Sequence, residues 1–149
     1  MRSLARIIGS TGLAFAIAAW ASAGGPPQPQ SFVDFCAYVG SNFTGGHWLG
    51  AFCRNNLTEV FGYNYSWIDL DLCVGNNASK LVPYNKGNYS TSCKRCKTSH
   101  DKKTLTLTCD CKNSKNGYSK SSLDLNTAIY DDNGSVGCFG HLGNKSVSP

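Results

Sequence analysis

A unit of about 55 residues occurs twice in this chain of 149 residues. Three blocks carry the repeat in the same order: residues 31–36 recur at 88–93, residues 49–53 at 105–109, and residues 66–71 at 121–126. The offset between the copies drifts only from 57 to 55 residues, as small loop insertions would produce. We therefore interpret the chain as two related halves, at about 31–86 and 87–142, that the fold must accommodate together.

Both halves have the residue pattern of β-strands. Between Leu105 and Cys111, apolar residues alternate with Thr and Asp, which predicts a strand with one buried face. Polar residues at 98–103 predict the turn of a hairpin, and Asn133-Gly134 predicts a second tight turn. A half of this size is too thin to bury a core alone, so the two halves are expected to share one core, with exchange of strands as one solution. The prediction is an all-β fold.

The first 23 residues have the pattern of a secretory signal peptide, with Arg2 and Arg6, an apolar stretch at 13–20 and a small-residue cleavage site. The apolar stretch is too short to span a bilayer. We therefore expect a secreted, extracellular protein with a disordered lead-in at 24–30, a domain at 31–142 and a tail at 143–149. Seven Asn-x-Ser/Thr sequons agree with export; they begin at Asn42, Asn56, Asn64, Asn77, Asn88, Asn133 and Asn144.

Eight cysteines follow the predicted signal, and an even number in a secreted chain of this size favours disulfides. The repeat aligns Cys53 with Cys109, so the favoured pairs are Cys36–Cys53 and Cys93–Cys109. Three pairings then remain for Cys73, Cys96, Cys111 and Cys138. A nested arrangement, Cys93–Cys111 with Cys96–Cys109, is the alternative. Export would leave few thiolates for a zinc site at 93–96 and 109–111, so neither a metal nor a cofactor is predicted.

The motifs together resemble the cyanovirin-N homology (CVNH) family. They are the aromatic-x-x-x-Cys motifs at 32–36 and 89–93, the Ile/Leu-Asp-Leu-Asp/Asn motifs at 68–71 and 123–126, and the Asn-Gly-Ser-Val segment at 133–136. The resemblance implies a pseudo-symmetric fold in which each half combines a three-stranded sheet with a β-hairpin from the other half. It also implies non-catalytic binding of mannose-type oligosaccharides or glycoproteins, by a monomer or a domain-swapped dimer, with no nucleic acid partner and no membrane span.

The resemblance places one carbohydrate site at each end of the molecule. At one end it implies Asn76, Asn88, Ser92, Asp110 and Lys112. At the other end it implies Ser31, Asp34, Arg54, Asn56, Asp131 and Asn133. Short amide, hydroxyl and carboxylate side chains of this kind offer the donors and acceptors that sugar hydroxyls need. Three departures reduce the polar contacts, because Gly75 stands where the family has an acidic residue, and Cys111 and Phe35 stand where it has hydroxyls.

An insertion before Ile68 brings Phe61, Tyr63 and Tyr65 near the second candidate site, where they would either stack on sugar rings or fill the gap between sheet and hairpin. The repeated Asp69 and Asp124 are interpreted as structural hydrogen-bond acceptors for nearby backbone rather than as a catalytic pair.

Two other classes of function compete with the lectin. An enzyme would need a general acid and base in one place, whereas His47, His100, His141 and Glu59 form no motif. A formal charge of +5 is too small and scattered to indicate nucleic acid binding. A secreted effector or cell-wall protein that keeps the fold but has lost sugar binding is the remaining alternative, because fold does not establish function.

Overall fold

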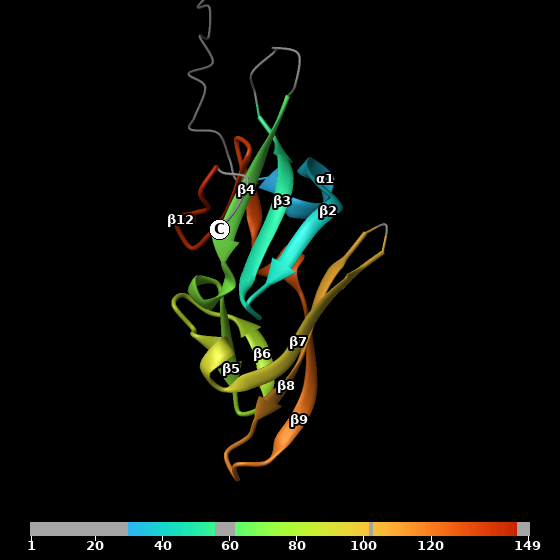
Figure 1. The fold of residues 1–149 in the computed structure, drawn as a ribbon. Helices are drawn as coiled ribbons and strands as arrows, with labels where there is room; N and C mark the ends of the chain where they lie inside the picture. The colour runs from blue at the N-terminus through green and yellow to red at the C-terminus, as the bar shows by residue number, and fades with distance from the viewer. Residues whose placement is uncertain (1–29, 56–61, 102, 146–149) are drawn as a thin grey trace, which may run out of the picture.

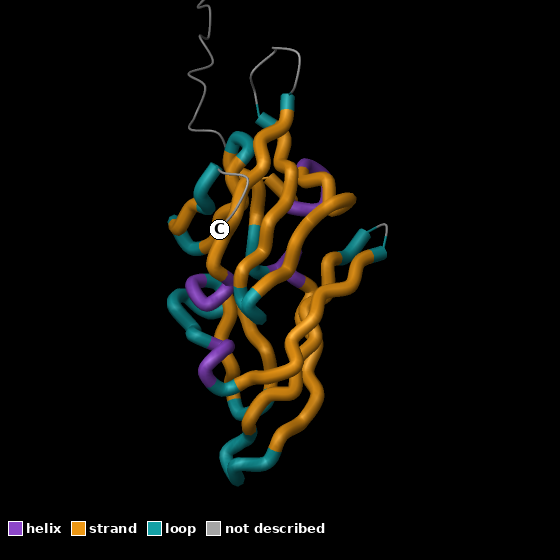
Figure 2. The backbone as a smooth tube through the Cα atoms, in the orientation of Figure 1, coloured by secondary structure: helices purple, strands orange, loops and turns teal. Residues whose placement is uncertain are grey.

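The protein was examined as a computed structural model that describes residues 30–55, 62–101 and 103–145 (Figure 1). Strands account for most of the described chain, and the helical segments are single turns (Figure 2). The strands are β1 (Gln30–Ser31), β2 (Cys36–Thr44), β3 (Trp48–Arg54), β4 (Tyr63–Asp69), β5 (Val74–Asn77), β6 (Lys80–Pro83), β7 (Cys93–His100), β8 (Leu105–Lys112), β9 (Tyr118–Asp124), β10 (Tyr130–Asp132), β11 (Ser135–Cys138) and β12 (His141–Leu142). The helical turns are α1 (Phe32–Phe35), η1 (Leu70–Leu72), η2 (Tyr89–Thr91) and η3 (Leu125–Thr127).

The repeat appears as two antiparallel three-stranded sheets, β2-β3-β4 and β7-β8-β9, each followed by a hairpin. The hairpins are exchanged: β11 of the second half packs on β4 of the first, and β6 of the first half packs on β9 of the second (Figure 1). The same hydrogen bond fixes both contacts, since the Val136 amide donates to Ser66 Oγ (3.1 Å) and the Leu81 amide donates to Ser121 Oγ (2.9 Å). The predicted all-β fold with exchanged hairpins is therefore confirmed.

The repeated Asp-Leu motif ends the third strand of each sheet with a single helical turn. Asp69 Oδ1 accepts the Asp71 amide, and Asp124 Oδ1 accepts the Asn126 amide, both at 3.0 Å. These are helix-capping bonds, which agrees with the structural interpretation of the two aspartates. Further bonds cross between the halves, because Asn126 Oδ1 accepts the Val33 amide at 3.1 Å. Asp71 likewise accepts the Ser90 amide, at 2.9 Å.

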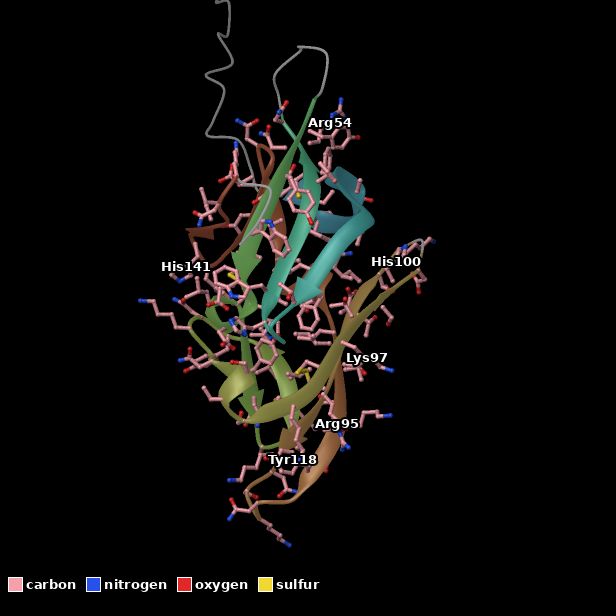
Figure 3. The ribbon with its side chains drawn as sticks, in the orientation of Figure 1. Arg54, Arg95, Lys97, His100, Tyr118 and His141 are labelled. Atoms are coloured by element: carbon pink, nitrogen blue, oxygen red, sulfur yellow. A yellow bond between two sulfur atoms is a disulfide. The ribbon has the colours of Figure 1, made fainter. Side chains whose placement is uncertain are left out.

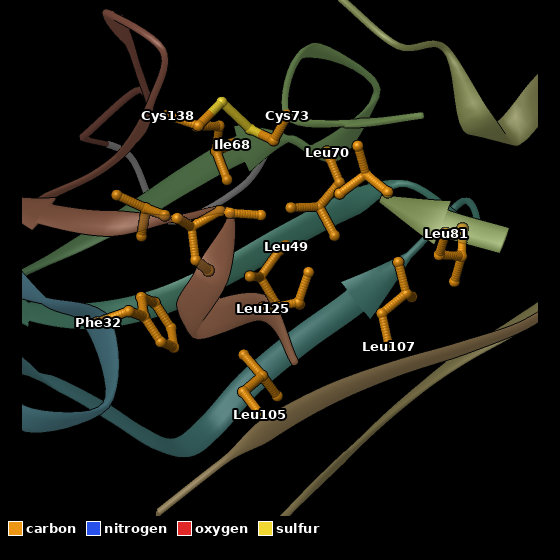
Figure 4. Packing of buried hydrophobic residues seen from close by; sticks show 14 of the residues in the cluster. Phe32, Leu49, Ile68, Leu70, Cys73, Leu81, Leu105, Leu107, Leu125 and Cys138 are labelled. Carbon is orange, nitrogen blue, oxygen red and sulfur yellow. A yellow bond between two sulfur atoms is a disulfide. The ribbon is translucent and has the colours of Figure 1, made fainter. Parts of the chain in front are cut away.

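One apolar core lies between the sheets and the exchanged hairpins (Figure 4). Leucines from both halves meet in it, among them Leu49, Leu70, Leu107 and Leu125, all fully buried. Tyr89 is also fully buried, and its hydroxyl donates to the Gly46 carbonyl of the other half at 2.7 Å. Burial raises the pKa of the Tyr89 hydroxyl far above its usual value. The hydroxyl therefore keeps its proton, and this hydrogen bond persists, at any physiological pH.

All eight cysteines form disulfides, but one predicted pair is wrong. Cys36–Cys53 is present as predicted, whereas the second sheet holds the nested pairs Cys93–Cys111 and Cys96–Cys109. The fourth bridge joins Cys73 to Cys138 and so ties the two halves together.

The correction has a physical reason in the register of the second sheet. Cys93 lies opposite Cys111, just as Cys36 lies opposite Cys53. The structural equivalent of Cys53 is therefore Cys111, not Cys109. Because side chains on a strand alternate with a period of two, a slip of two residues keeps every apolar residue on the same face. The sequence pattern alone could not separate the two alignments.

The edges of the domain also differ from the prediction. Gln30 pairs with Asp131 in the sheet, and the amides of Gly143 and Asn144 donate to the carbonyls of Val136 (2.7 Å) and Trp67 (2.8 Å). These residues therefore belong to the folded domain rather than to the lead-in or tail, so the limits 31 and 142 are each too narrow. The predicted signal peptide and residues 24–29 lie outside the described residues.

The predicted turn at 98–103 is shorter than expected, because residues 98–100 continue β7. The chain reverses at Asp101, whose carboxylate accepts the amides of Lys103 and Thr104, both at 2.9 Å. Such an aspartate-capped turn is typical, and its hydrogen bonds lower the pKa of the Asp101 carboxyl. Across residues 30–55, 62–101 and 103–145, the helical turns are all too short to cross a bilayer.

Candidate functional site

A cleft of about 360 Å³ opens beside the β5–β6 hairpin. It is lined by Gly75, Asn76, Asn77, Val82, Tyr84 and Gly87. Two glycines make the close packing under it possible: a Cβ atom on Gly87 would lie 2.4 Å from the Val74 carbonyl oxygen, and one on Gly75 would lie 3.0 Å from Cβ of Tyr84. Tyr84 and Gly87 thus occupy the space that the side chain of the acidic residue expected at position 75 would enter.

Asn76 fastens the hairpin to the second sheet below the cleft. Its Nδ2 donates to Ser92 Oγ at 3.0 Å and to the Lys112 carbonyl at 2.9 Å. Its Oδ1 accepts the Ser79 amide at 2.9 Å. Both donors of the side chain are therefore engaged within the protein, and Asn76 positions the cleft more than it offers hydrogen bonds to a ligand.

The structure brings together most of the residues predicted at this end. Asn76, Ser92 and Lys112 are joined by the bonds just described, and Asn88 forms an isolated β-bridge with Gly75. Asn88 is exposed and its Nδ2 donates to the Lys86 carbonyl, which leaves its Oδ1 toward solvent or ligand. Asp110 is the exception, because it pairs with Arg95 Nε at 2.6 Å beside a different groove.

Sequence reasoning missed four residues that line the cleft: Asn77, Val82, Tyr84 and Gly87. Tyr84 is 63% exposed, the highest value among the large hydrophobic residues in the described ranges. The signal in the sequence was an aromatic residue and a glycine within the polar stretch 83–87, a combination that favours a binding loop over a simple linker.

The residues predicted at the other end are not gathered in the same way. Ser31 is in β1 and pairs with Tyr130, while Asp34 and Arg54 are exposed on α1 and at the end of β3. Asn133 is exposed at the tip of the β10–β11 hairpin with a φ of 49°, the left-handed conformation expected of an Asn-Gly turn. Asn56 lies outside the described residues.

The structure does not favour Asp131 as a sugar ligand, because its side chain is only 1% exposed. It is the structural equivalent of Asn76, since its Oδ1 accepts the Gly134 amide at 2.9 Å just as Asn76 accepts that of Ser79. The second oxygen of the carboxylate, Oδ2, is buried without a hydrogen-bond partner, where Asn76 has an N–H donor. Burial raises the pKa of the Asp131 carboxyl above its usual value.

We therefore expect Asp131→Asn to stabilise the protein at neutral pH by about 1–2 kcal/mol, because it replaces a buried carboxylate, which is costly to ionise there, with a neutral amide. The wild type keeps its full stability below the ordinary pKa of the carboxyl, about 3.9, and loses stability as the pH rises through the raised folded pKa. The difference in free energy of unfolding between the variant and the wild type should thus widen from about pH 4 upward.

Urea unfolding followed from pH 4 to pH 8 measures this gap. Asp34→Asn is the matched control, since Asp34 is exposed and its change should alter the free energy of unfolding by less than about 0.5 kcal/mol. The assignment of Asp131 as a buried carboxyl with a raised pKa is contradicted if the variant is only as stable as the wild type at pH 7. It is also contradicted if the difference in free energy of unfolding narrows with rising pH.

The inserted aromatic residues point away from the exchanged hairpin. On β4, Ser66 binds the Val136 amide of the hairpin, so the alternating Tyr63 and Tyr65 occupy the outer face of the sheet. Tyr65 packs edge-on against Phe52, with ring centroids 4.5 Å apart. These two tyrosines therefore do not fill the gap between sheet and hairpin. Phe61 lies outside the described residues.

The described histidines are dispersed over the molecule. His141 Nε2 is 2.9 Å from Asn85 Oδ1, His47 lies beside Trp48, and His100 ends β7 on another side (Figure 3). Glu59 lies outside the described residues. Within the described ranges, one group has the composition of a metal site, Cys36 with Cys53 and Asp131, but the two cysteines form a disulfide and offer no thiolates.

The chain is similar to one protein family and to several solved structures. The CVNH domain family matches residues 6–142. Among solved structures, TbCVNH from T. borchii is 28% identical, with a TM-score of 0.55 over 73% of this chain and 99% of that one. GzCVNH from Gibberella zeae is 23% identical, with a TM-score of 0.56 over 67% of this chain and 94% of that one.

A third similar structure is the microvirin:mannobiose complex. It is 17% identical, with a TM-score of 0.57 over 74% of this chain and 99% of that one. At this identity the likeness shows the fold alone. No curated protein sequence matches the chain.

Proposed function

Because this chain belongs to the CVNH domain family, we propose that it is a lectin that binds mannose-type oligosaccharides without transforming them. The observation that carries the proposal is the cleft beside the β5–β6 hairpin. It combines an exposed tyrosine, Tyr84, with the exposed amide of Asn77, and the exposed Asn88 follows directly after its lining residue Gly87. Small-molecule sites have this composition, an apolar or aromatic wall with a few convergent polar groups.

The cleft is built to recognise rather than to react. Its polar groups are side-chain amides, backbone groups and the Tyr84 hydroxyl, and its lining residues carry no carboxylate, imidazole or thiol. The disulfides beneath it keep its frame rigid, which lowers the entropy cost of binding a flexible sugar. Microvirin, whose complex with mannobiose has the same fold, supports the choice of a mannose disaccharide as the first ligand to test.

The same proposal places the protein outside the cell. Every cysteine is paired, and four disulfides in a domain of this size are typical of an oxidising compartment. The sequons at Asn77 and Asn88 fall at the cleft, so glycans on these residues would obstruct it. Binding is therefore best tested on protein made without N-glycans.

Titration of the full chain with mannobiose, followed by amide NMR shifts, tests the proposal. We expect the shifts to be concentrated at Asn77, Tyr84 and Gly87, and we expect Tyr84→Ala to weaken binding by about tenfold, or about 1.4 kcal/mol. The change removes the one large ring of the cleft but leaves the bonds of Asn76 in place.

Phe139→Ala is the matched control, because Phe139 is an aromatic residue of similar exposure, 48%, in the turn between β11 and β12. It should bind mannobiose as the wild type does. Absence of any shift in the wild type would refute the lectin proposal and favour an effector of the same fold. Shifts that avoid the cleft would refute the site.

A further inference from the structure

The outer face of the β7-β8-β9 sheet, turned away from the core, forms a grid of polar and charged side chains. Three residues lie side by side in one row, Lys94 opposite Asp110 and Asp110 opposite Lys120. The next row along the strands is Lys97, Thr108 and Ser122. Successive rows are about 7 Å apart, because two residues of a strand separate side chains on the same face.

Positive charge dominates this grid. Five of the 14 lysines and arginines of the chain lie on it, all exposed: Lys94, Arg95, Lys97, Lys112 and Lys120. Arg95 is on the bulge of β7, with φ of 53°, and pairs with Asp110. Lys94 Nζ lies over the Tyr118 ring, 3.6 Å from its centroid. In the described part of the chain, no carboxylate forms an ion pair with Lys97, Lys112 or Lys120.

A groove of about 460 Å³ runs through the cationic part of the grid. It is lined by Arg95, Lys97, Thr108, Cys109, Asp110 and Lys120. Figure 3 shows Arg95 and Lys97 on the same side of the sheet, projecting outward. The groove shares no lining residue with the cleft beside the β5–β6 hairpin, so the two surfaces can be occupied independently.

The equivalent face of the first sheet is different in kind. In the register of the two sheets, Phe52 and Tyr65 lie side by side where the second sheet has Asp110 and Lys120. The duplicated fold therefore does not require a cationic face, since the same positions accept aromatic rings. Arg54 of the first sheet corresponds to Lys112, but the cations that line the groove, Arg95, Lys97 and Lys120, belong to the second half.

We propose that this cationic face binds an acidic polysaccharide, a chain that carries carboxylate or sulfate groups at intervals along its length. Lysine and arginine side chains supply the charge, and the hydroxyls of Thr108 and Ser122, 2.8 Å apart, lie between them to receive sugar hydroxyls. Charges in rows about 7 Å apart along the strands fit a polymer that carries repeated charges better than a single small anion.

An acidic polysaccharide fits this face better than a nucleic acid does. Grooves that bind single-stranded nucleic acid present aromatic rings for base stacking, whereas the residues that line this groove include no aromatic ring. The paired cysteines indicate an oxidising compartment, where acidic polysaccharides rather than nucleic acids are the common polyanions.

Binding of the full chain to heparin, measured by calorimetry in about 50 mM salt, tests the proposal. Lys97→Glu/Lys120→Glu reverses two charges in the groove and should weaken heparin binding at least about tenfold, or about 1.4 kcal/mol. Raising the salt to about 500 mM should weaken the wild-type complex by a similar factor or more. Mannobiose should not displace heparin.

Lys80→Glu/Lys86→Glu is the charge-matched control. Both lysines are exposed in and after β6, outside the β7-β8-β9 sheet, and this variant should keep most of the heparin affinity. Amide NMR spectra establish that both double variants are folded. The proposal fails if wild type does not bind heparin, if the control loses as much affinity as the groove variant, or if a DNA duplex binds as tightly as heparin.

Discussion

Cys73→Ala/Cys138→Ala is expected to lower the free energy of unfolding by about 4 kcal/mol, the largest loss among the four disulfides. This bridge closes a segment of 65 residues, and the entropy of the unfolded chain that a crosslink removes grows with the length it closes. It also joins η1 of the first half to β11 of the second, at a point where both cysteines are fully buried. Without it, the exchanged β10–β11 hairpin is held to the first half by noncovalent contacts alone.

Equilibrium unfolding in guanidinium under non-reducing conditions measures the effect. The control is Cys96→Ala/Cys109→Ala, which opens a bridge across 13 residues within one hairpin and should cost about 3 kcal/mol. A loss from the Cys73–Cys138 pair that is no larger than the loss from the control would contradict the assignment of this bridge as the main tie between the halves.

Leu70→Ala and Leu125→Ala should each destabilise the protein by about 3–4 kcal/mol. The two leucines occupy equivalent places in the two halves, each directly after a capping aspartate, and both are 0% exposed. Removal of a fully buried leucine side chain costs the transfer free energy of the lost methyl groups plus the energy of the cavity. Since both open onto the same core, the two costs should agree within about 1 kcal/mol.

Urea titration of each single variant gives the comparison. Leu142→Ala is the control, because Leu142 is 54% exposed and should lose less than about 1 kcal/mol. If one of the two buried leucines proves as tolerant as Leu142, the halves do not contribute equally to a shared core, and the pseudo-symmetry of the packing is wrong.

The duplicated halves and their strands could be predicted because each block combines a short apolar alternation with a fixed turn or cap. Asp69 and Asp124 illustrate this, since both cap a helical turn from their own strand end with local hydrogen bonds. Local bonds depend on neighbours in the sequence, and a repeated sequence therefore repeats them.

The register of the second sheet could not be predicted in the same way. Cys109 and Cys111 lie on the same face of β8, so either would satisfy the burial pattern, and the choice of Cys111 as the partner of Cys93 follows from the bulge at Lys94–Lys97. A bulge changes the pairing across strands without leaving a signal in the alternation of one strand.

The candidate site, too, could be predicted only in part from the sequence. Asn76, Ser92 and Lys112 were found together, but the cleft depends on Gly75, Tyr84 and Gly87, which approach one another only through the close packing of backbone from separate segments. Asp131 was chosen for its polar side chain, yet it lies in the exchanged β10–β11 hairpin, and its burial depends on the packing of that hairpin against the first half.

The amino-acid sequence by itself determined the two halves, the β-strands, the capped turns and the need for disulfides, because these rest on alternation, local hydrogen bonds and composition. Tertiary structure alone decided which cysteines pair in the second half, which polar residues are buried, and which side chains share the cleft and the cationic face. Those outcomes depend on contacts between strands far apart in the chain, and such contacts follow from packing geometry rather than from the order of residues.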